Sequence, residues 1–368
     1  MIEFLPVIIL ILSFVILLIL GVPVAWSIAI SSLLTLMVAM PFSAATTTIS
    51  QRIATGLDSF ALLAIPFFIL SGQIMSRGGI ANRLISFAKT LVGFLPGGLA
   101  LINIVSAMLM GSIAGSAMAS ASAMGTILGP EMEKEGYSKE FGAAVNITSS
   151  TTGLIIPPSN TLIVYSLASG GVSISALFLA GYIPGILTGL LMMIVAMIWA
   201  KKNNYPVGKR SSIKEVAVKF INALPSLLLL IIVIGGIIAG IFTATEASAV
   251  AVLYTILLSF YYKELSIKDL SKVVLESTKT TAVVMLLIGA SMGMSWVLSY
   301  ENIPQDISNS LLSLSDNKII ILLMINIILL AIGIFMDATP AVLIFTPIFL
   351  PIVTDLGMDP THFGIVMM

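Results

Sequence analysis

Long apolar runs with almost no charged side chains determine what this chain can fold into. The runs of membrane-spanning length are residues 4–20, 23–41, 59–76, 141–168, 175–200, 223–241, 244–262 and 279–299. A helix needs about 20 predominantly apolar residues to cross the hydrocarbon core of a bilayer. Charged residues make up only 9% of the sequence, whereas soluble domains carry roughly 25%. We therefore predict an all-α polytopic protein that lies in a lipid bilayer.

Two further apolar regions, residues 96–133 and 318–355, are each about twice the length of one span. Small or polar residues interrupt both regions halfway, as "GSIAGSAMASAS" at 111–122 and "MDATP" at 336–340. Each region could form one long helix, two spans, or a re-entrant hairpin that enters the membrane and turns back.

The distribution of Lys and Arg favours re-entrant hairpins, because short cytoplasmic loops are enriched in basic residues. With two hairpins and an external N-terminus, the cytoplasmic segments are residues 77–93, 131–140, 201–219 and 263–279. These segments hold 15 of the 17 basic residues, and Arg52 and Lys318 lie outside. Two full crossings in either region remain an alternative, although the spans would be short.

The two halves of the chain resemble each other. A shift of 221 residues places Gly72 on Gly293 and Pro130 on Pro351. The predicted order is also the same in both halves: a span, an amphipathic segment, a hairpin and a discontinuous span. The first half begins outside and the second inside, so we predict inverted repeats. Inverted repeats with broken helices at the middle of the membrane are typical of secondary transporters.

This pattern divides the chain into four parts. We expect N-terminal scaffold helices (1–58), repeat 1 (59–200), a basic cytoplasmic loop with two linking scaffold helices (201–278), and repeat 2 (279–368). Repeat 1 contains an arm helix, hairpin 96–133 and broken helix 141–168; repeat 2 contains hairpin 318–355. Because repeat 2 stops soon after its hairpin, we expect the natural protein to continue for roughly 50 to 60 residues.

Pro157 and Pro158 break the predicted span 141–168 within "GLIIPPSNTLIVYS". Proline has no N–H and clashes with the carbonyl four residues earlier, and free backbone groups at that depth occur only where they are buried in protein or line a cavity. The polar residues around the break are Asn146, Thr148, Ser149, Ser150, Thr151, Thr152, Ser159 and Asn160. Their neutral oxygens suit a sodium ion. The alternative is a proline kink whose hydroxyls bond back to their own helix.

Residues at the two predicted hairpin tips complete the candidate site. Asp337 lies at the second tip, where an ionisable group inside a membrane predicts function; with Thr339 it offers hard oxygen ligands, and its alternative role is an N-cap. The predicted sodium and substrate residues are Gly111, Ser112, Gly115, Ser116, Asn146, Thr152, Pro157, Pro158, Ser159, Asp337 and Thr339. The candidate sodium ligands among them are Ser112, Asn146, Asp337 and Thr339.

Other small or polar residues have structural explanations. Gly125 and Gly129 are spaced as small residues are where membrane helices pack closely, so we predict packing roles for both. Thr245 and Glu246 are further candidates for binding, but Thr243 and Glu246 form a capping-box pattern. His362, at the start of an apolar span, is predicted to be structural.

Three motifs together resemble one family. They are "GSIAGSAMASASAMGTILGPEMEKEGYSKEFGAAV", "GLIIPPSNTLIVYSLASGGVSISALFLAGYIPGIL", and "GIFTATEASAVAVLY" at 240–254. Over essentially the whole chain the sequence is similar to the large membrane (M) subunit of TRAP, the tripartite ATP-independent periplasmic transporters. The family's "TPTEA" is "TATEA" here, without the proline.

The resemblance implies a sodium-driven importer of small organic acids, such as C4-dicarboxylates or sialic acid. It also implies an elevator mechanism on a fold of the ion transporter superfamily type, in the bacterial inner membrane. The expected partners are a small membrane (Q) subunit, a periplasmic substrate-binding (P) protein, the co-transported sodium and the carboxylate, with no organic cofactor and no nucleic acid.

Two other classes of protein are alternatives to a TRAP membrane subunit: a membrane enzyme and a different secondary transporter. An enzyme is disfavoured because the chain has no Cys, one His and no paired acidic motif within a span. A stand-alone divalent-anion and sodium symporter, or an ion antiporter of related fold, would have the same hairpin architecture and is the alternative. A TRAP subunit depends on a periplasmic binding protein for transport, whereas a stand-alone carrier does not.

Overall fold

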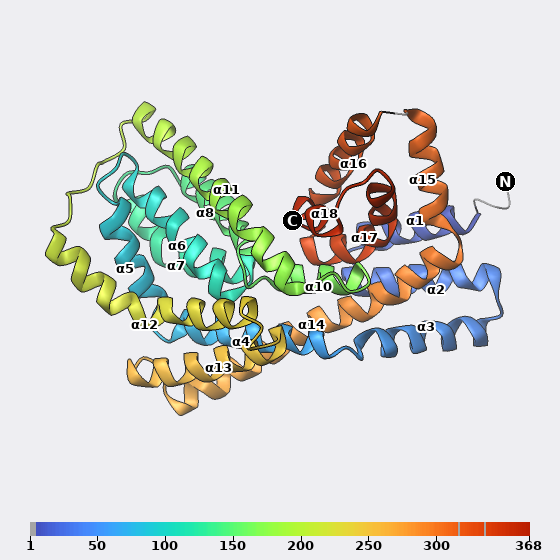
Figure 1. The fold of residues 1–368 in the computed structure, drawn as a ribbon, viewed down its shortest axis with the longest axis horizontal. Coiled ribbons are helices and arrows are strands. Elements are labelled where there is room, and N and C mark those ends of the chain that lie inside the picture. Colours follow the sequence, from blue (N-terminus) through green and yellow to red (C-terminus); the bar gives the residue numbers. More distant parts are fainter. Residues whose placement is uncertain (1–4, 316, 335) are drawn as a thin grey trace. The chain divides into compact units, whose positions relative to one another are not determined.

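The computed structural model describes residues 5–315, 317–334 and 336–368, and the regular elements of this part of the chain are helices (Figure 1). Six stretches are long and apolar enough to cross a bilayer: Phe60–Arg77 (a 3₁₀ turn and α4), α11 (Ile174–Lys202), α12 (Ile213–Ile238), α13 (Ala244–Tyr261), α14 (Ile267–Tyr300) and α17 (Ala338–Asp355). The shorter apolar helices are α1 (Leu5–Ile19), α2 (Val24–Ala39), α6 (Gly98–Ala114) and α16 (Lys318–Gly333). The predicted all-α, multi-span architecture is confirmed.

The helices form two compact units. The first unit contains the chain up to Leu62 together with Ile163–Ser173 and Lys279–Met368, and the second contains Leu63–Leu162 and Ile174–Thr278. The first unit thus joins segments from both ends of the sequence, whereas the second is interrupted only by residues 163–173. The four parts expected from the sequence remain a prediction.

The first unit contains a helix that the sequence analysis did not predict. Residues Phe42–Leu57 form α3, although the stretch "SAATTTISQR" is too polar to resemble a span. Figure 1 shows α3 beside α2, and Ala45 and Ile49 of α3 pack with Leu36 of α2 and Val297 of α14 in one buried cluster. This helix therefore exists because one narrow face is buried by tertiary contacts.

The rest of the first unit contains α15 (Ile303–Leu314), α16, α17 and α18 (Pro360–Met367). Asp359 caps α18, because its carboxylate accepts hydrogen bonds from the backbone N–H groups of Thr361 and His362. These hydrogen bonds lower the pKa of the Asp359 carboxyl. Hydrogen bonding with Thr361 has the largest effect, and the His362 N–H contributes less. The Tyr165 hydroxyl donates to the Pro360 carbonyl at 2.6 Å, which ties the end of α10 (Asn160–Ala168) to the start of α18.

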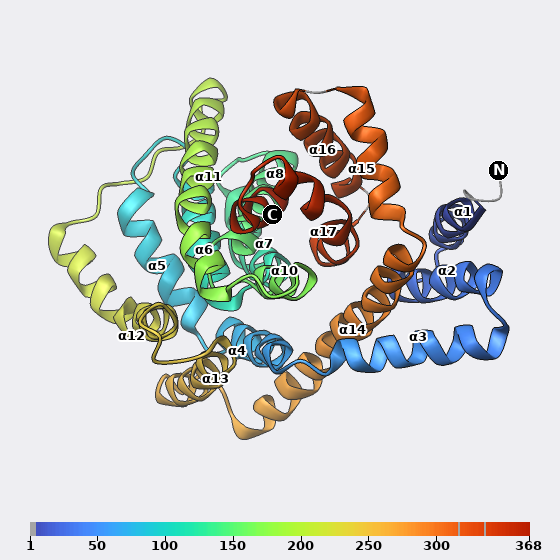
Figure 2. The same ribbon diagram turned by 45° about the vertical axis from the view of Figure 1, so that its right-hand side comes forward.

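The second unit is built around α6. Helix α6 contacts α5 (Ile80–Val92), α7 (Ala117–Lys134), α8 (Lys139–Ser150), α9 (Thr152–Ile155) and α11, and also α4 and α12. Helices α6 and α7 pack side by side (Figures 1 and 2), with the Ser120 hydroxyl of α7 donating to the Ala107 carbonyl of α6 at 3.2 Å. The interrupted region 96–133 is thus a pair of packed helices rather than one long helix.

The order of helices repeats as predicted. Helix α7 begins at Ala117 and α17 at Ala338; α8 begins at Lys139 and α18 at Pro360. Both pairs of starts are 221 residues apart, the same shift that aligned the sequences. The opposite membrane orientation of the repeats and the re-entrant path of the hairpins remain predictions.

Candidate functional site

The tip of the first helix pair is formed by Gly115 and Ser116. Gly115 adopts a left-handed conformation with φ 61°, and its N–H bonds to the Gly111 carbonyl at 2.8 Å, which ends α6. Glycine reaches this region without the clash that a Cβ would cause. Ser116 is extended, and its Oγ accepts the Ala119 N–H at 3.3 Å and so caps α7. The turn therefore follows from local chemistry at two adjacent residues.

The second break lies at Ile156–Ser159, between α9 and α10, and includes a cis peptide bond between Pro157 and Pro158. The Ser159 hydroxyl donates to the Leu154 carbonyl and accepts the Leu162 N–H. These bonds satisfy part of the backbone that the prolines leave without helical partners. The predicted break of span 141–168 is confirmed.

The two breaks meet. The Asn160 N–H, directly after the prolines, donates to the Gly115 carbonyl at 3.2 Å. A Cβ on Gly115 would lie 2.8 Å from the Pro158 carbonyl oxygen, and one on Gly111 would lie 2.4 Å from the Gly153 Cα. The tip and the proline break are therefore in backbone contact, and only glycine permits this approach. The predicted tip and the predicted break therefore lie against each other, and their role in binding remains a prediction.

Several hydroxyls of the site bond back to their own helices. Ser112 Oγ donates to the Leu109 carbonyl at 2.8 Å, and Thr152 Oγ1 to the Ser149 carbonyl at 2.6 Å. Both residues are buried. This is the local pattern that the kink interpretation predicted, but each oxygen keeps a lone pair that could face a ligand.

Two amide oxygens are buried without a hydrogen-bond partner in the described part of the chain: Oδ1 of Asn146 and Oδ1 of Asn160. The Asn146 Nδ2 donates to the Ala121 carbonyl at 2.9 Å and so joins α8 to α7. Buried polar atoms without partners are rare and call for an explanation such as a bound ion or water. Asn160 was noted beside the prolines but not included among the predicted ligands.

Asn103 is a further polar residue that the sequence analysis missed. It is buried in α6, where its Oδ1 accepts the Ser149 hydroxyl at 3.1 Å. With Asn146 it lines a cavity of about 350 Å³ beside Gly125 and Gly129. An amide within the apolar run "LALINIVSAML" was the signal that could have identified it.

The glycine roles differ partly from the prediction. A Cβ on Gly125 would lie 2.8 Å from the Asn146 Nδ2, so close packing at Gly125 is confirmed. The packing role predicted for Gly129 is wrong, because a Cβ there would meet nothing within 4 Å. Gly129 borders open cavity space instead. Gly111, assigned to binding, is a close backbone contact with Gly153.

Asp337 and Thr339 belong to the first unit. Asp337 is the exposed N-cap residue of α17, with φ −65° and ψ 156°, but its side chain makes no capping hydrogen bond. Thr339 is half-buried. That these two residues share one ion site with the residues around Gly115 remains a prediction.

Glu246 forms the predicted capping box. Its carboxylate accepts the Thr243 N–H at 2.8 Å, and its own N–H donates to the Thr243 Oγ1 at 3.2 Å. The neighbouring Thr245 is buried, and its carbonyl accepts the Ser248 hydroxyl at 2.6 Å. The contacts of Glu246 therefore support a helix-capping role.

Whether the Glu246 carboxylate acts only as a helix cap can be tested by substitution. The substitution Glu246→Gln keeps an oxygen that can accept the Thr243 N–H, so we expect transport to remain close to that of the unmodified chain. Thr243→Ala is expected to lower the unfolding temperature, because loss of an N-cap costs about 1 kcal/mol. Thermal unfolding and uptake measured on both variants check this. A loss of transport by a well-folded Glu246→Gln protein would assign the carboxylate a functional charge.

Comparison with known proteins places this geometry in a family. Residues 11–368 match the family described as "Tripartite ATP-independent periplasmic transporter, DctM component". The chain is 54% identical over 362 residues to the uncharacterized protein YgiK of Salmonella typhimurium, covering 98% of this chain and 83% of that protein. It is 40% identical over 311 residues to the C4-dicarboxylate TRAP transporter large permease protein DctM of Pseudomonas aeruginosa, covering 84% and 73%.

A solved structure supports the fold independently. The YdaH transporter of Alcanivorax borkumensis, whose crystal structure shows an unusual topology, superposes with a TM-score of 0.57 at 14% identity over 88% of this chain and 75% of that one. At this identity the likeness concerns the fold alone. The family match and the 40% identical large permease together decide the assignment: the chain is a multi-pass membrane protein that belongs to the DctM component family of the tripartite ATP-independent periplasmic transporters.

Proposed function

We propose that this chain is the large membrane subunit of a sodium-coupled TRAP transporter that imports a small organic carboxylate into the cytoplasm across the bacterial inner membrane. A periplasmic binding protein delivers the substrate, and a small membrane subunit completes the complex. The substrate class is a C4-dicarboxylate, as in the name of the Pseudomonas aeruginosa relative, or a related acid such as sialic acid.

The contact between the Gly115 tip and the proline break carries this proposal. Beside this contact, Gly111 and Gly153 also approach each other through their backbones, and their neighbours Ser112 and Thr152 carry buried, neutral hydroxyl groups. Asn146 lies earlier on α8, where its amide donates to the Ala121 carbonyl of α7. A sodium ion accepts such a set of neutral oxygens, and the partnerless Asn146 Oδ1 is available as a ligand. Asp337 and Thr339 are proposed to complete the site from the second repeat, and an elevator movement would carry the site across the membrane.

Uptake into proteoliposomes tests the function directly. The chain is reconstituted with its partner membrane subunit, and the binding protein is added outside with candidate acids in turn. We expect uptake that requires both an inward sodium gradient and the binding protein. Transport by the chain reconstituted alone would instead identify a stand-alone symporter, and transport independent of sodium would reject the coupling.

Asn146 provides a finer test of the proposed ion site. Replacing it by alanine removes the partnerless oxygen and the tie to Ala121. A hydrogen bond or dipole contact to a charged group is worth about 1.5–3 kcal/mol, so we expect the half-saturating sodium concentration of Asn146→Ala to rise by about tenfold or more. The control is Asn203→Ala, because Asn203 is exposed just after α11 and its amide donates to the Trp199 carbonyl of that helix. Unchanged sodium dependence of Asn146→Ala would remove Asn146 from the site.

A further inference from the structure

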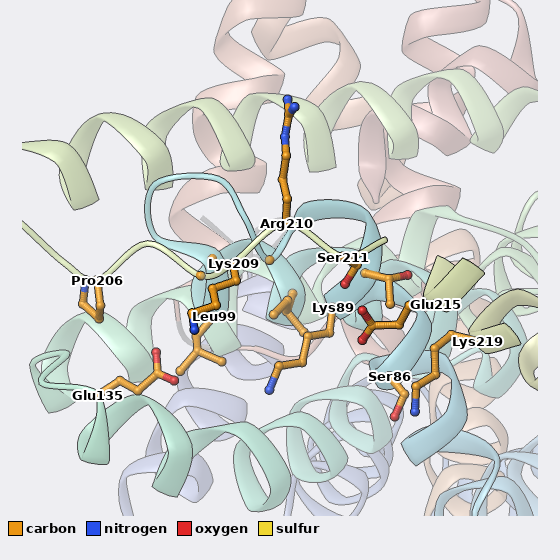
Figure 3. Close-up of a pocket in the computed structure, with 15 residues that line it drawn as sticks. Ser86, Lys89, Leu99, Glu135, Pro206, Lys209, Arg210, Ser211, Glu215 and Lys219 are labelled. Atoms are coloured by element: carbon orange, nitrogen blue, oxygen red, sulfur yellow. The ribbon is translucent and has the colours of Figure 1, made fainter. Parts of the chain in front are cut away.

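A second polar cavity lies in the second unit, apart from the residues assigned to transport. It has a volume of about 500 Å³, which is within the usual size range of small-molecule sites. Its walls come from the end of α5, the start of α6, the segment after α7, the loop before α12 and the start of α12 (Figure 3). The residues that decide its chemistry are Lys89, Leu99, Glu135, Lys209, Glu215 and Lys219.

The loop that covers this cavity is seated on the α5–α6 turn. Pro96 and Val207 form an antiparallel backbone bridge. A Cβ on Gly208 would lie 2.4 Å from the Gly93 carbonyl oxygen, so the two backbones are in direct contact there. These contacts hold the loop backbone against the α5–α6 turn on one side of the cavity.

Three ammonium groups belong to this cavity. Figure 3 shows Lys89, Lys209 and Lys219 extending to the same side of the loop, while Arg210 projects to the opposite side. Arg210 lies over the Phe94 ring, 5.0 Å from its centroid. In the described part of the chain, none of the three lysines forms an ion pair. The cavity therefore presents cationic hydrogen-bond donors that have no carboxylate partner among the residues that the structure describes.

The opposing charges are two carboxylates, Glu135 and Glu215. They are outnumbered by the three ammonium groups, and the α6 N-terminus adds further positive potential. Gly97, the N-cap of α6, provides no side-chain cap, and Leu99 of the first turn lines the cavity. The free N–H groups and dipole of a helix N-terminus favour an anion. Lysine donors with a helix N-terminus are a recurrent way to bind phosphate.

The start of α12 carries side chains of the kind that contact a membrane surface. Ile213 is 90% exposed, Ile221 63% and Phe220 42%, next to the basic Lys214 and Lys219. An amphipathic helix with apolar and basic side chains of this kind lies in the headgroup region of a bilayer. Basic pockets beside membrane helices bind anionic headgroups.

We propose that this cavity binds the phosphoryl group of an anionic ligand, either an anionic phospholipid headgroup or free phosphate, through Lys89, Lys209 and Lys219. The site is separate from the transport site and does not require the proposed sodium coupling.

Native mass spectrometry of the detergent-purified full chain tests this proposal. The probes are phosphatidylglycerol, the zwitterionic phosphatidylcholine, and inorganic phosphate as a competitor. We expect the chain to bind phosphatidylglycerol more tightly than phosphatidylcholine. The triple variant Lys89→Gln, Lys209→Gln, Lys219→Gln is expected to bind phosphatidylglycerol at least about tenfold more weakly, since each basic residue near a lipid surface contributes to the attraction.

The matched control is Lys201→Gln, Lys202→Gln, Lys268→Gln. It removes the same charge from exposed positions of the second unit that do not line the cavity, and it should bind phosphatidylglycerol like the unmodified chain. Inorganic phosphate that binds the unmodified chain and displaces the lipid would identify free phosphate as a ligand, whereas lipid binding without competition would identify the headgroup; either supports the site. Equal losses in both triple variants, or no preference for phosphatidylglycerol and no phosphate binding, would overturn it.

Discussion

Replacing Gly111 by valine is expected to abolish sodium-driven uptake of the organic acid. A Cβ at this position would lie 2.4 Å from the Gly153 Cα and 3.0 Å from the Gly153 nitrogen, which are backbone atoms that cannot rotate away. Relief requires the hairpin tip to separate from the proline break. Overpacking of this kind typically lowers the free energy of unfolding by about 1–3 kcal/mol. It would also separate the Gly115 tip from the proline break where the two are in contact. Uptake by proteoliposomes containing the complete complex measures the effect.

Gly129→Val is the matched control for Gly111→Val. Gly129 lies in the same helix pair, but a Cβ there meets nothing within 4 Å, so we expect the control protein to transport. Thermal unfolding of both variants in detergent separates loss of the site from loss of the fold. Equal uptake by the two variants would show that the contact between Gly111 and Gly153 is not required for transport.

The second large effect is expected at Asp337. The substitution Asp337→Asn retains the size and capping ability of the side chain but removes its charge, so it should abolish uptake at all but very high sodium concentrations. The other proposed sodium ligands are neutral oxygens, so the Asp337 carboxylate supplies the negative charge that balances the sodium ion. Sodium titrations of uptake in proteoliposomes measure the shift.

Asp355→Asn is the control for Asp337→Asn. Asp337 precedes the first residue of α17 and Asp355 is the last residue of that helix, both are exposed, and the chemical change is identical. We expect Asp355→Asn to transport normally. Uptake by Asp337→Asn with unchanged sodium dependence would show that Asp337 is only a helix-cap residue and would remove it from the proposed site.

Local features of the sequence predicted most of the helices and both breaks of the second unit. The break after Ala114 was predicted because glycine and serine cluster at 111–116, and these residues supply the left-handed turn and the N-cap. The break at Pro157 and Pro158 was predicted because proline lacks an N–H. The capping box at Thr243 and Glu246 was also predicted from local sequence. All three features depend on residues within about one helical turn of one another.

Contacts between distant segments could not be predicted in this way. Helix α3 was missed because its apolar face is narrow and is recognisable only once Leu36 and Val297 cover it. Gly129 was misjudged because glycine spacing does not show whether a neighbouring helix is present. In both cases the deciding partner lies on another helix.

The sequence by itself determined the all-helical, multi-span architecture and the positions of the helix breaks, because these depend on the length of apolar runs and on the backbone preferences of proline and glycine. The family was indicated by the resemblance of three sequence motifs. Only the tertiary structure decided that the Gly115 tip touches the Pro158 break, and that the buried Oδ1 atoms of Asn146 and Asn160 have no hydrogen-bond partner among the described residues. Hydrogen-bond satisfaction depends on which atoms of α6, α7, α8 and α10 are brought within about 3 Å of one another. That proximity is a property of packing between segments, and no local pattern of residues encodes it.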